Sequence, residues 1–159
     1  MLISGSITIF AYGSNMFTER IRERVPSALR LSIGQLSGHT LRWHKRGQDG
    51  SGKCDAEVTK CDTDVVWGVV YVCRASEKLD LDIIEGLGMG YDEKEVEILT
   101  ETNIIKAFMY CATDKDPSLY PYHWYKAFVV NGAREHGLPQ DYIERIEAVS
   151  SIPDRLDSL

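Results

Sequence analysis

The segment Ser6–Arg24 places a strand, a tight turn and a helix in direct succession, and it constrains the fold more than any other part of the chain. Apolar side chains occur on both faces of residues 7–12, which predicts a strand that is buried on both sides. The turn Gly13–Asn15 interrupts this pattern, because glycine adopts backbone angles that other residues disfavour and serine and asparagine favour turns and N-caps. A helix is expected over Met16–Arg24 and ends before Pro26.

Such a turn presents several backbone N–H groups at one point. It can therefore bind a carboxylate or stabilise a developing oxyanion. An ordinary connection between a strand and a helix gives the same local pattern, so the turn alone does not assign a function.

The length and charge of the chain limit the classes of protein to which it can belong. Its 159 residues are enough for one domain with a substantial core, which we expect over residues 1–150, followed by a loose polar tail over 151–159. No apolar stretch has membrane-spanning length and no basic region precedes the first strand, so we expect no signal peptide and a cytoplasmic location. The net charge of -6 argues against a nucleic-acid partner, and the locally basic segment Arg42–Lys53 is expected to be a solvated hairpin.

The cysteine and histidine spacing does not predict a metal site. The four cysteines form no C-x-x-C pair, and no histidine lies at ligand spacing from them. We therefore expect reduced thiols, with Cys73 and Cys111 in the core.

The rest of the chain predicts short strands with few helices between them, and hence an α+β fold. Strands are expected over Leu29–Arg46 (one or two), Cys54–Lys60, Val65–Cys73, Tyr91–Leu99 and Ile104–Cys111. Helices are expected over Glu77–Glu85, Tyr122–His136 and from Pro139 to about Ser150. The strands lack a regular helix between each pair, which favours a small mixed sheet curled into a barrel with flanking helices.

Helical spacing also predicts which side chains face the core. In Glu77–Glu85, the apolar residues Leu79 and Ile83 are four apart and are expected to point inward. The last helix is expected to bury Tyr142, Ile143 and Ile146.

Several segments, taken in order, resemble the γ-glutamylcyclotransferase (AIG2-like) family. They are IFAYGSNMFTERI, VVWGVVYV, LDLDIIEG with a tyrosine shortly after it, and PSLYPYHWYKAFVVNGAREHGLPQDYIERI. The resemblance covers most of Ile7–Ile146 and is sparse between Leu29 and Asp64. It implies a small barrel-like α+β domain that releases an amino acid from a γ-glutamyl dipeptide and forms 5-oxoproline. It also implies no metal or organic cofactor, and many members of the family are homodimers.

The same resemblance implies a set of site residues. The glutamate of the family's Leu-Asp-x-x-Glu-Gly motif corresponds to Glu85, which would serve as general base and then general acid. On periodicity alone, Tyr110 and Tyr125 fit a hydrophobic core equally well, but the resemblance favours a site. The residues expected to bind the substrate are Ile9, Phe10, Ala11, Tyr12, Gly13, Ser14, Asn15, Tyr91, Tyr110 and Tyr125.

Two alternatives stay open at this point. The same ring closure could release a different group, either from a γ-glutamyl amine such as an isopeptide-linked lysine or from glutathione. A protein of this fold could also bind a small molecule without catalysis, although a glutamate in the motif argues against it. Covalent catalysis by Ser14 is not expected, because the chain has no G-x-S-x-G motif and no histidine is implicated as its base.

Overall fold

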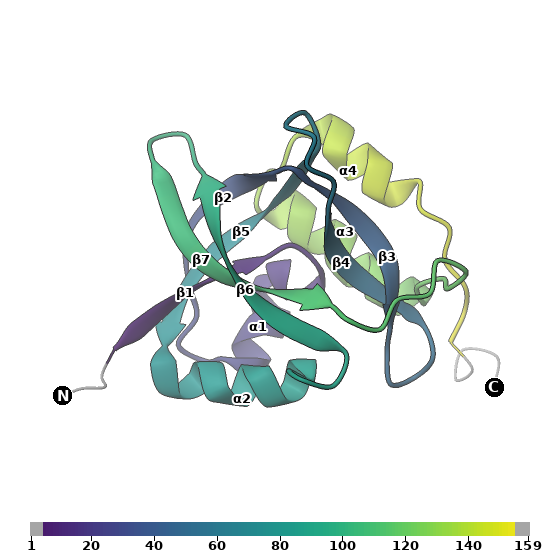
Figure 1. Cartoon of the computed structure of the whole chain (residues 1–159), viewed down its shortest axis with the longest axis horizontal. Helices are drawn as coiled ribbons and strands as arrows, with labels where there is room; N and C mark the ends of the chain where they lie inside the picture. The colour runs from purple at the N-terminus through teal and green to yellow at the C-terminus, as the bar shows by residue number, and fades with distance from the viewer. Residues whose placement is uncertain (1–4, 155–159) are drawn as a thin grey trace.

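The computed structural model describes residues 5–154, and five of its strands close into a barrel in the order β1-β5-β2-β6-β7 (Figure 1). The barrel strands are β1 (Ser6–Ala11), β2 (Leu29–Ser37), β5 (Val65–Arg74), β6 (Tyr91–Leu99) and β7 (Ile104–Ala112). A separate hairpin joins β3 (His39–Arg46) to β4 (Gly52–Val58). The predicted α+β class with a small barrel is confirmed.

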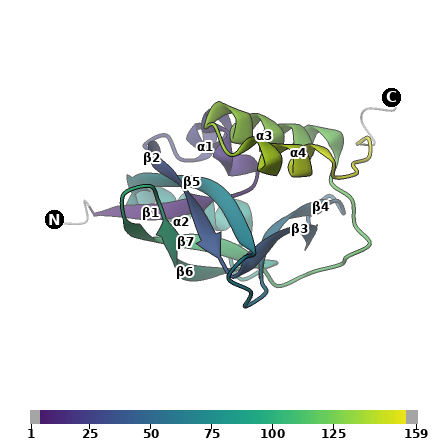
Figure 2. The same cartoon turned by 90° about the horizontal axis from the view of Figure 1, so that it is seen from above.

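The helices lie outside the barrel. They are the short 3-10 helix η1 (Ser14–Met16), α1 (Thr18–Arg24), α2 (Ala75–Glu85), α3 (His123–Glu135) and α4 (Gln140–Glu147). Figure 2 shows α1, α3 and α4 gathered on one side of the sheets, whereas α2 runs below the barrel in Figure 1. No helix within residues 5–154 is both long enough and apolar enough to cross a bilayer.

Strand β1 closes the barrel. It pairs with β5 in antiparallel register and with β7 in parallel register, where Ile9 lies opposite Phe108. Residues Ile9–Tyr12 are consequently buried, as their apolar pattern predicts. The chain leaves the barrel at this point and enters the turn Gly13–Asn15, which overlaps the start of η1.

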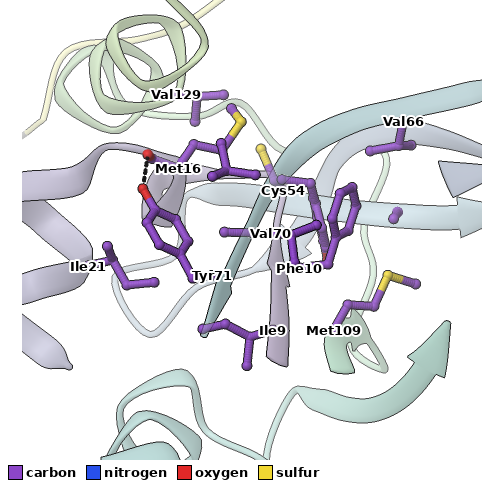
Figure 3. Packing of buried hydrophobic residues seen from close by; sticks show 14 of the residues in the cluster. Ile9, Phe10, Met16, Ile21, Cys54, Val66, Val70, Tyr71, Met109 and Val129 are labelled. Atoms are coloured by element: carbon purple, nitrogen blue, oxygen red, sulfur yellow. Dashed lines mark hydrogen bonds between the residues drawn. The ribbon is translucent and has the colours of Figure 1, made fainter. Parts of the chain in front are cut away.

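The core fixes the position of that turn. Tyr71, on β5, is fully buried, and its hydroxyl donates a 2.8 Å hydrogen bond to the Met16 carbonyl (Figure 3). His136 Nε2 also lies 2.9 Å from that carbonyl oxygen. Strand β5 and the end of α3 therefore both hold η1, which contains Ser14 and Asn15 of the turn.

Helix α2 is turned differently from the prediction. Leu79 and Ile83 are 64% and 78% exposed, so the expectation that they face the core is wrong. Leu81 and Lys78 are buried instead, and the Lys78 ammonium pairs with Asp82 and with Glu93 of β6. The helix therefore packs through an ion-paired polar face, which apolar spacing does not reveal.

Three smaller expectations also change. Lys45 is buried, so the segment Arg42–Lys53 forms the expected hairpin but is not fully solvated. Cys111 is only partly buried, whereas Cys73 lies in the core as expected. Residues 151–154 are not loose, because Ile152 exchanges backbone hydrogen bonds with Pro121 and His123. Residues 1–4 and 155–159 lie outside the described part of the chain.

Candidate active site

A narrow cavity of about 50 Å³ lies where β1 ends and the turn begins. Its wall comes from β1, the turn, α2, β4, β6, β7 and α3. It contains every residue expected at the site: Ile9, Phe10, Ala11, Tyr12, Gly13, Ser14, Asn15, Glu85, Tyr91, Tyr110 and Tyr125. The fold thus brings together side chains from both halves of the chain.

Three further residues complete the wall, and the sequence analysis missed them: Cys54, Leu81 and Phe108. Two of them had a detectable signal. Leu81 precedes Glu85 by one helical turn, and Phe108 precedes Tyr110 by two residues on a strand, so each shares a face with an expected residue. Cys54 shares a face of β4 with Ala56, and both are buried, so the alternating pattern indicates burial of Cys54 but not a place in the site.

The turn Gly13–Asn15 lines the cavity and contributes three backbone N–H groups to this part of the chain. Within residues 5–154, none of its three N–H groups has a backbone acceptor. A Cβ atom on Gly13 would lie 3.1 Å from Cys54 Cβ and 3.3 Å from the Tyr125 hydroxyl oxygen. A glycine therefore lets the backbone approach Tyr125 closely, so that backbone and side-chain donors face the same small space.

Glu85 lies beside this turn at the end of α2. The helix ends there because Gly86 adopts a left-handed conformation with φ of 76°. Glu85 Oε1 accepts a 2.7 Å hydrogen bond from Asn15 Nδ2 and a 3.1 Å charged hydrogen bond from Arg24 Nη1. Its Oε2 has no hydrogen-bond partner in the described residues, so one carboxylate oxygen is held while the other is available to a ligand.

The tyrosine hydroxyls have different partners, and these determine what each can offer a ligand. The Tyr125 oxygen accepts a 3.0 Å hydrogen bond from the Cys54 N–H. The hydroxyl also interacts with the Cys54 thiol, which is a weak acceptor, so its proton can turn from the sulfur to a ligand. The Tyr91 hydroxyl donates to the Cys54 carbonyl at 2.7 Å, and the Tyr110 hydroxyl donates to Asp82. Burial raises the pKa of Tyr91 and Tyr125 well above the usual value, so both hydroxyls stay neutral at physiological pH.

No side chain in the cavity is arranged as a covalent nucleophile. Burial raises the pKa of the Cys54 thiol to about 12, which leaves almost no thiolate at neutral pH. The Ser14 hydroxyl accepts a 3.0 Å hydrogen bond from Arg20 Nε rather than facing a histidine base. The cavity therefore favours proton transfer through Glu85 and hydrogen bonding to an anionic group.

Three side chains of the β3–β4 hairpin have the composition of a metal site. The ligand atoms of His44, Asp55 and Glu57 are within 4.8 Å of one another. Lys115 Nζ lies 3.8 Å from Asp55 and 3.7 Å from Glu57, and the Ala112 N–H also donates to Asp55. An ammonium group thus already provides positive charge to these carboxylates, and none of the three residues lines the cavity.

The profile of the AIG2-like family matches residues 65–146. The human protein γ-glutamylcyclotransferase is 36% identical over 150 residues, which cover 91% of this chain and 79% of the human protein. The mouse γ-glutamylcyclotransferase is 35% identical, with coverage of 88% and 77%. A solved structure of a γ-glutamyl cyclotransferase is 30% identical, covers 97% of both chains and superposes with a TM-score of 0.85.

Proposed function

This chain belongs to the γ-glutamylcyclotransferase family, and we propose that it releases an amino acid from a γ-glutamyl dipeptide and closes the glutamyl part into 5-oxoproline. The α-amine of the substrate attacks its own γ-carbonyl, so binding the dipeptide in a folded pose brings both reacting groups together. Two tasks remain for the protein. The ammonium group must lose a proton, and the carbonyl oxygen must carry negative charge in the tetrahedral intermediate.

Glu85 performs the first task, and its position beside the turn is the observation that carries the proposal. Asn15 and Arg24 hold Oε1, which orients the carboxylate and leaves Oε2 free to take a proton from the ammonium group. A carbon–nitrogen bond then forms between the amine and the γ-carbon, and the bond to the leaving nitrogen breaks. Glu85 returns that proton to the leaving nitrogen, which departs as a neutral amine. The attacking nitrogen loses its second proton to Glu85, which releases it to solvent, and the ring amide N–H remains.

The turn and Tyr125 perform the second task. The free N–H groups of Gly13–Asn15 and the Tyr125 hydroxyl converge on the cavity and can bind the substrate α-carboxylate or the developing oxyanion. Because both hydroxyl and amide donors are neutral, they stabilise an anion without titrating near neutral pH. The side chain of Asn15 contributes by holding Glu85 rather than by touching the oxyanion.

We also propose that the protein acts in the cytoplasm as one catalytic domain over residues 1–150. The chemistry is proton transfer and acyl transfer, which needs no redox group, so no metal or organic cofactor is invoked. The cavity is formed by residues between Ile9 and Tyr125, which supports a single domain. The substrates would be small γ-glutamyl compounds, including those related to glutathione.

A panel of three substrates tests this function. The purified protein is incubated with γ-glutamyl-alanine, with lysine carrying a γ-glutamyl group on its side chain, and with glutathione, and the 5-oxoproline formed is quantified. We expect 5-oxoproline and free alanine in equal amounts from the dipeptide. If 5-oxoproline forms only from the lysine compound or only from glutathione, that compound and not the dipeptide is the substrate. No product from any of the three would contradict catalysis and favour a binding protein of the same fold.

A further inference from the structure

A second, wider cavity of about 480 Å³ adjoins the first. Ser14, Glu85, Tyr91 and Tyr125 line both cavities, so the two share the carboxylate that we assign as the base. A single water needs about 10–15 Å³ by the same kind of measure, so the inner cavity of about 50 Å³ has room for only a few small groups. The part of a substrate beyond the reacting carbonyl must therefore lie in the outer cavity.

The outer cavity is lined by more positive than negative side chains. Among the described residues, its basic side chains are Arg20, Arg24, Lys45, Arg46 and Lys53, and its acidic ones are Asp49, Glu85 and Asp114. This excess of positive charge occurs in a chain whose net charge is -6. A local field of sign opposite to that of the whole molecule favours an anionic ligand at this position.

Most of these cations already have an acidic partner. Arg24 pairs with Glu85, Lys53 with Asp49, and Arg46 with Asp114 and Asp116. Within residues 5–154, Lys45 and Arg20 have no carboxylate within ion-pair distance. They are therefore the positive groups of this cavity that are free to bind an anion from a ligand.

Lys45 is the better placed of the two. It is only 6% exposed, and its ammonium nitrogen lies 4.4 Å from the centre of the Tyr91 ring. Lys53 Nζ lies 4.5 Å from the centre of the Tyr125 ring. Because Tyr91 and Tyr125 also form the wall of the inner cavity, the two ammonium groups stand where one cavity joins the other.

The covalent structure of a γ-glutamyl amino acid matches this arrangement. Its leaving nitrogen must lie near Glu85, and the carboxylate carbon of the leaving amino acid is only two bonds beyond that nitrogen. The Lys45 ammonium lies over the Tyr91 ring and has no carboxylate within ion-pair distance in the described residues, so a ligand carboxylate bound there would give it an anionic partner. Burial lowers the pKa of both Lys45 and Lys53, which shows that solvent compensates their charges poorly.

We propose that Lys45 binds the carboxylate of the leaving amino acid, with Lys53 beside it, and that the enzyme thereby selects γ-glutamyl amino acids over γ-glutamyl amines. This inference rests on the proposed function. It assigns a specificity role to the β3–β4 hairpin, because both lysines lie on that hairpin.

The test compares two substrates that differ only in this carboxylate. The value of kcat/KM is measured for γ-glutamyl-alanine and for γ-glutamyl-alaninamide, whose terminal group is neutral. We expect the wild-type protein to prefer the carboxylate by about 10- to 100-fold, the range of a hydrogen bond to a charged group. Lys45→Met is expected to reduce that preference to within about threefold of unity, mainly through KM. Lys45→Arg is expected to keep most of it, and Lys106→Met, at an exposed position on β7, to keep all of it.

Each outcome of this comparison has a defined meaning. A wild-type protein that turns over both substrates equally well, or a Lys45→Met variant that loses activity equally on both, would overturn the proposal. Absence of 5-oxoproline from both substrates would instead contradict the proposed function. If circular dichroism shows that Lys45→Met is unfolded, the ratio of kcat/KM for the two substrates is measured in Lys53→Met instead. A preference equal to that of the wild type in this variant would also overturn the proposal.

Discussion

Tyr125 contributes a hydroxyl whose role is set by its backbone partner. Its oxygen accepts a hydrogen bond from the Cys54 N–H, and the Cys54 thiol beside it is only a weak acceptor, so the hydroxyl can donate to a ligand in the inner cavity. We predict that Tyr125→Phe lowers kcat for γ-glutamyl-alanine by about 10²–10³, the usual loss when one donor to an oxyanion is removed. Stability should fall by about 1–3 kcal/mol, because the buried Cys54 N–H loses its acceptor.

Tyr142→Phe is the matched control for this variant. Tyr142 is also a buried tyrosine, but it lies on α4 and does not line either cavity. Its loss of the hydroxyl should leave kcat unchanged. Equal kcat values for Tyr125→Phe and Tyr142→Phe would show that the Tyr125 hydroxyl does not contact the reacting atoms.

At this scale, the sequence was most informative where it resembled known relatives. Glu85 was selected through its motif, because a glutamate near a helix end is ordinarily solvated. Apolar spacing misplaces Leu79 and Ile83, because the inward face of α2 carries Lys78 and Asp82, which pair with each other. A polar face turned inward violates the amphipathic rule, and such violations are expected where a helix presents functional groups.

At the scale of elements, the contact between α3 and η1 positions the turn. A Cβ atom on Gly132 of α3 would lie 2.7 Å from both Met16 Cβ and the Phe17 nitrogen, closer than packed atoms come. A glycine to alanine change within a helix normally adds about 1 kcal/mol of stability. Here the overlap with the backbone of η1 should lower the stability by about 1–3 kcal/mol, so that the change destabilises the protein instead of stabilising it.

We therefore predict that Gly132→Ala destabilises the protein and also lowers kcat/KM, because relief of the overlap shifts η1 and with it the donors of the turn. Urea unfolding and steady-state kinetics measure the two effects. Asn131→Ala, on an exposed position of the same helix, is the control and should be near neutral. A Gly132→Ala variant that is more stable than the wild type and fully active would contradict this account of the turn.

The elements and the barrel class were largely predictable, and the order and pairing of the strands in the barrel were not. Alternating and continuous apolar runs located the strands, since each pattern reports local burial. Closure of the barrel depends on the parallel contact of β1 with β7, where Ile9 meets Phe108 across nearly 100 residues. No local pattern encodes that pairing, and the cavity exists only because the barrel closes there.

For the whole molecule, stability should depend on pH through buried histidines. Burial lowers the pKa of His136 and of His39 below the usual value of about 6.5. As the pH falls through that value, the unfolded chain takes up protons that the folded protein does not, so the free energy of unfolding decreases. The lowered pKa values of Asp49 and Glu135 act at more acidic pH and do not contribute in this range.

We predict that the protein is less stable in urea at about pH 5.5 than at about pH 7.5. His136→Gln should reduce this difference, because glutamine can donate to the Met16 carbonyl without titrating. His123→Gln, at an exposed position, should leave it unchanged. The same dependence on pH in wild type and His136→Gln would show that His136 is not responsible.

In the proposed reaction, the Glu85 carboxylate transfers the protons that ring closure requires. The most direct measurement is the rate of 5-oxoproline formation from saturating γ-glutamyl-alanine by Glu85→Gln, which keeps the shape of the side chain but removes the base. Glu95→Gln, at an exposed position on β6, serves as the control. We predict that kcat falls by about 10²–10⁴ in Glu85→Gln and stays at the wild-type value in Glu95→Gln. A folded Glu85→Gln variant that retains kcat within about threefold of the wild type would contradict the claim.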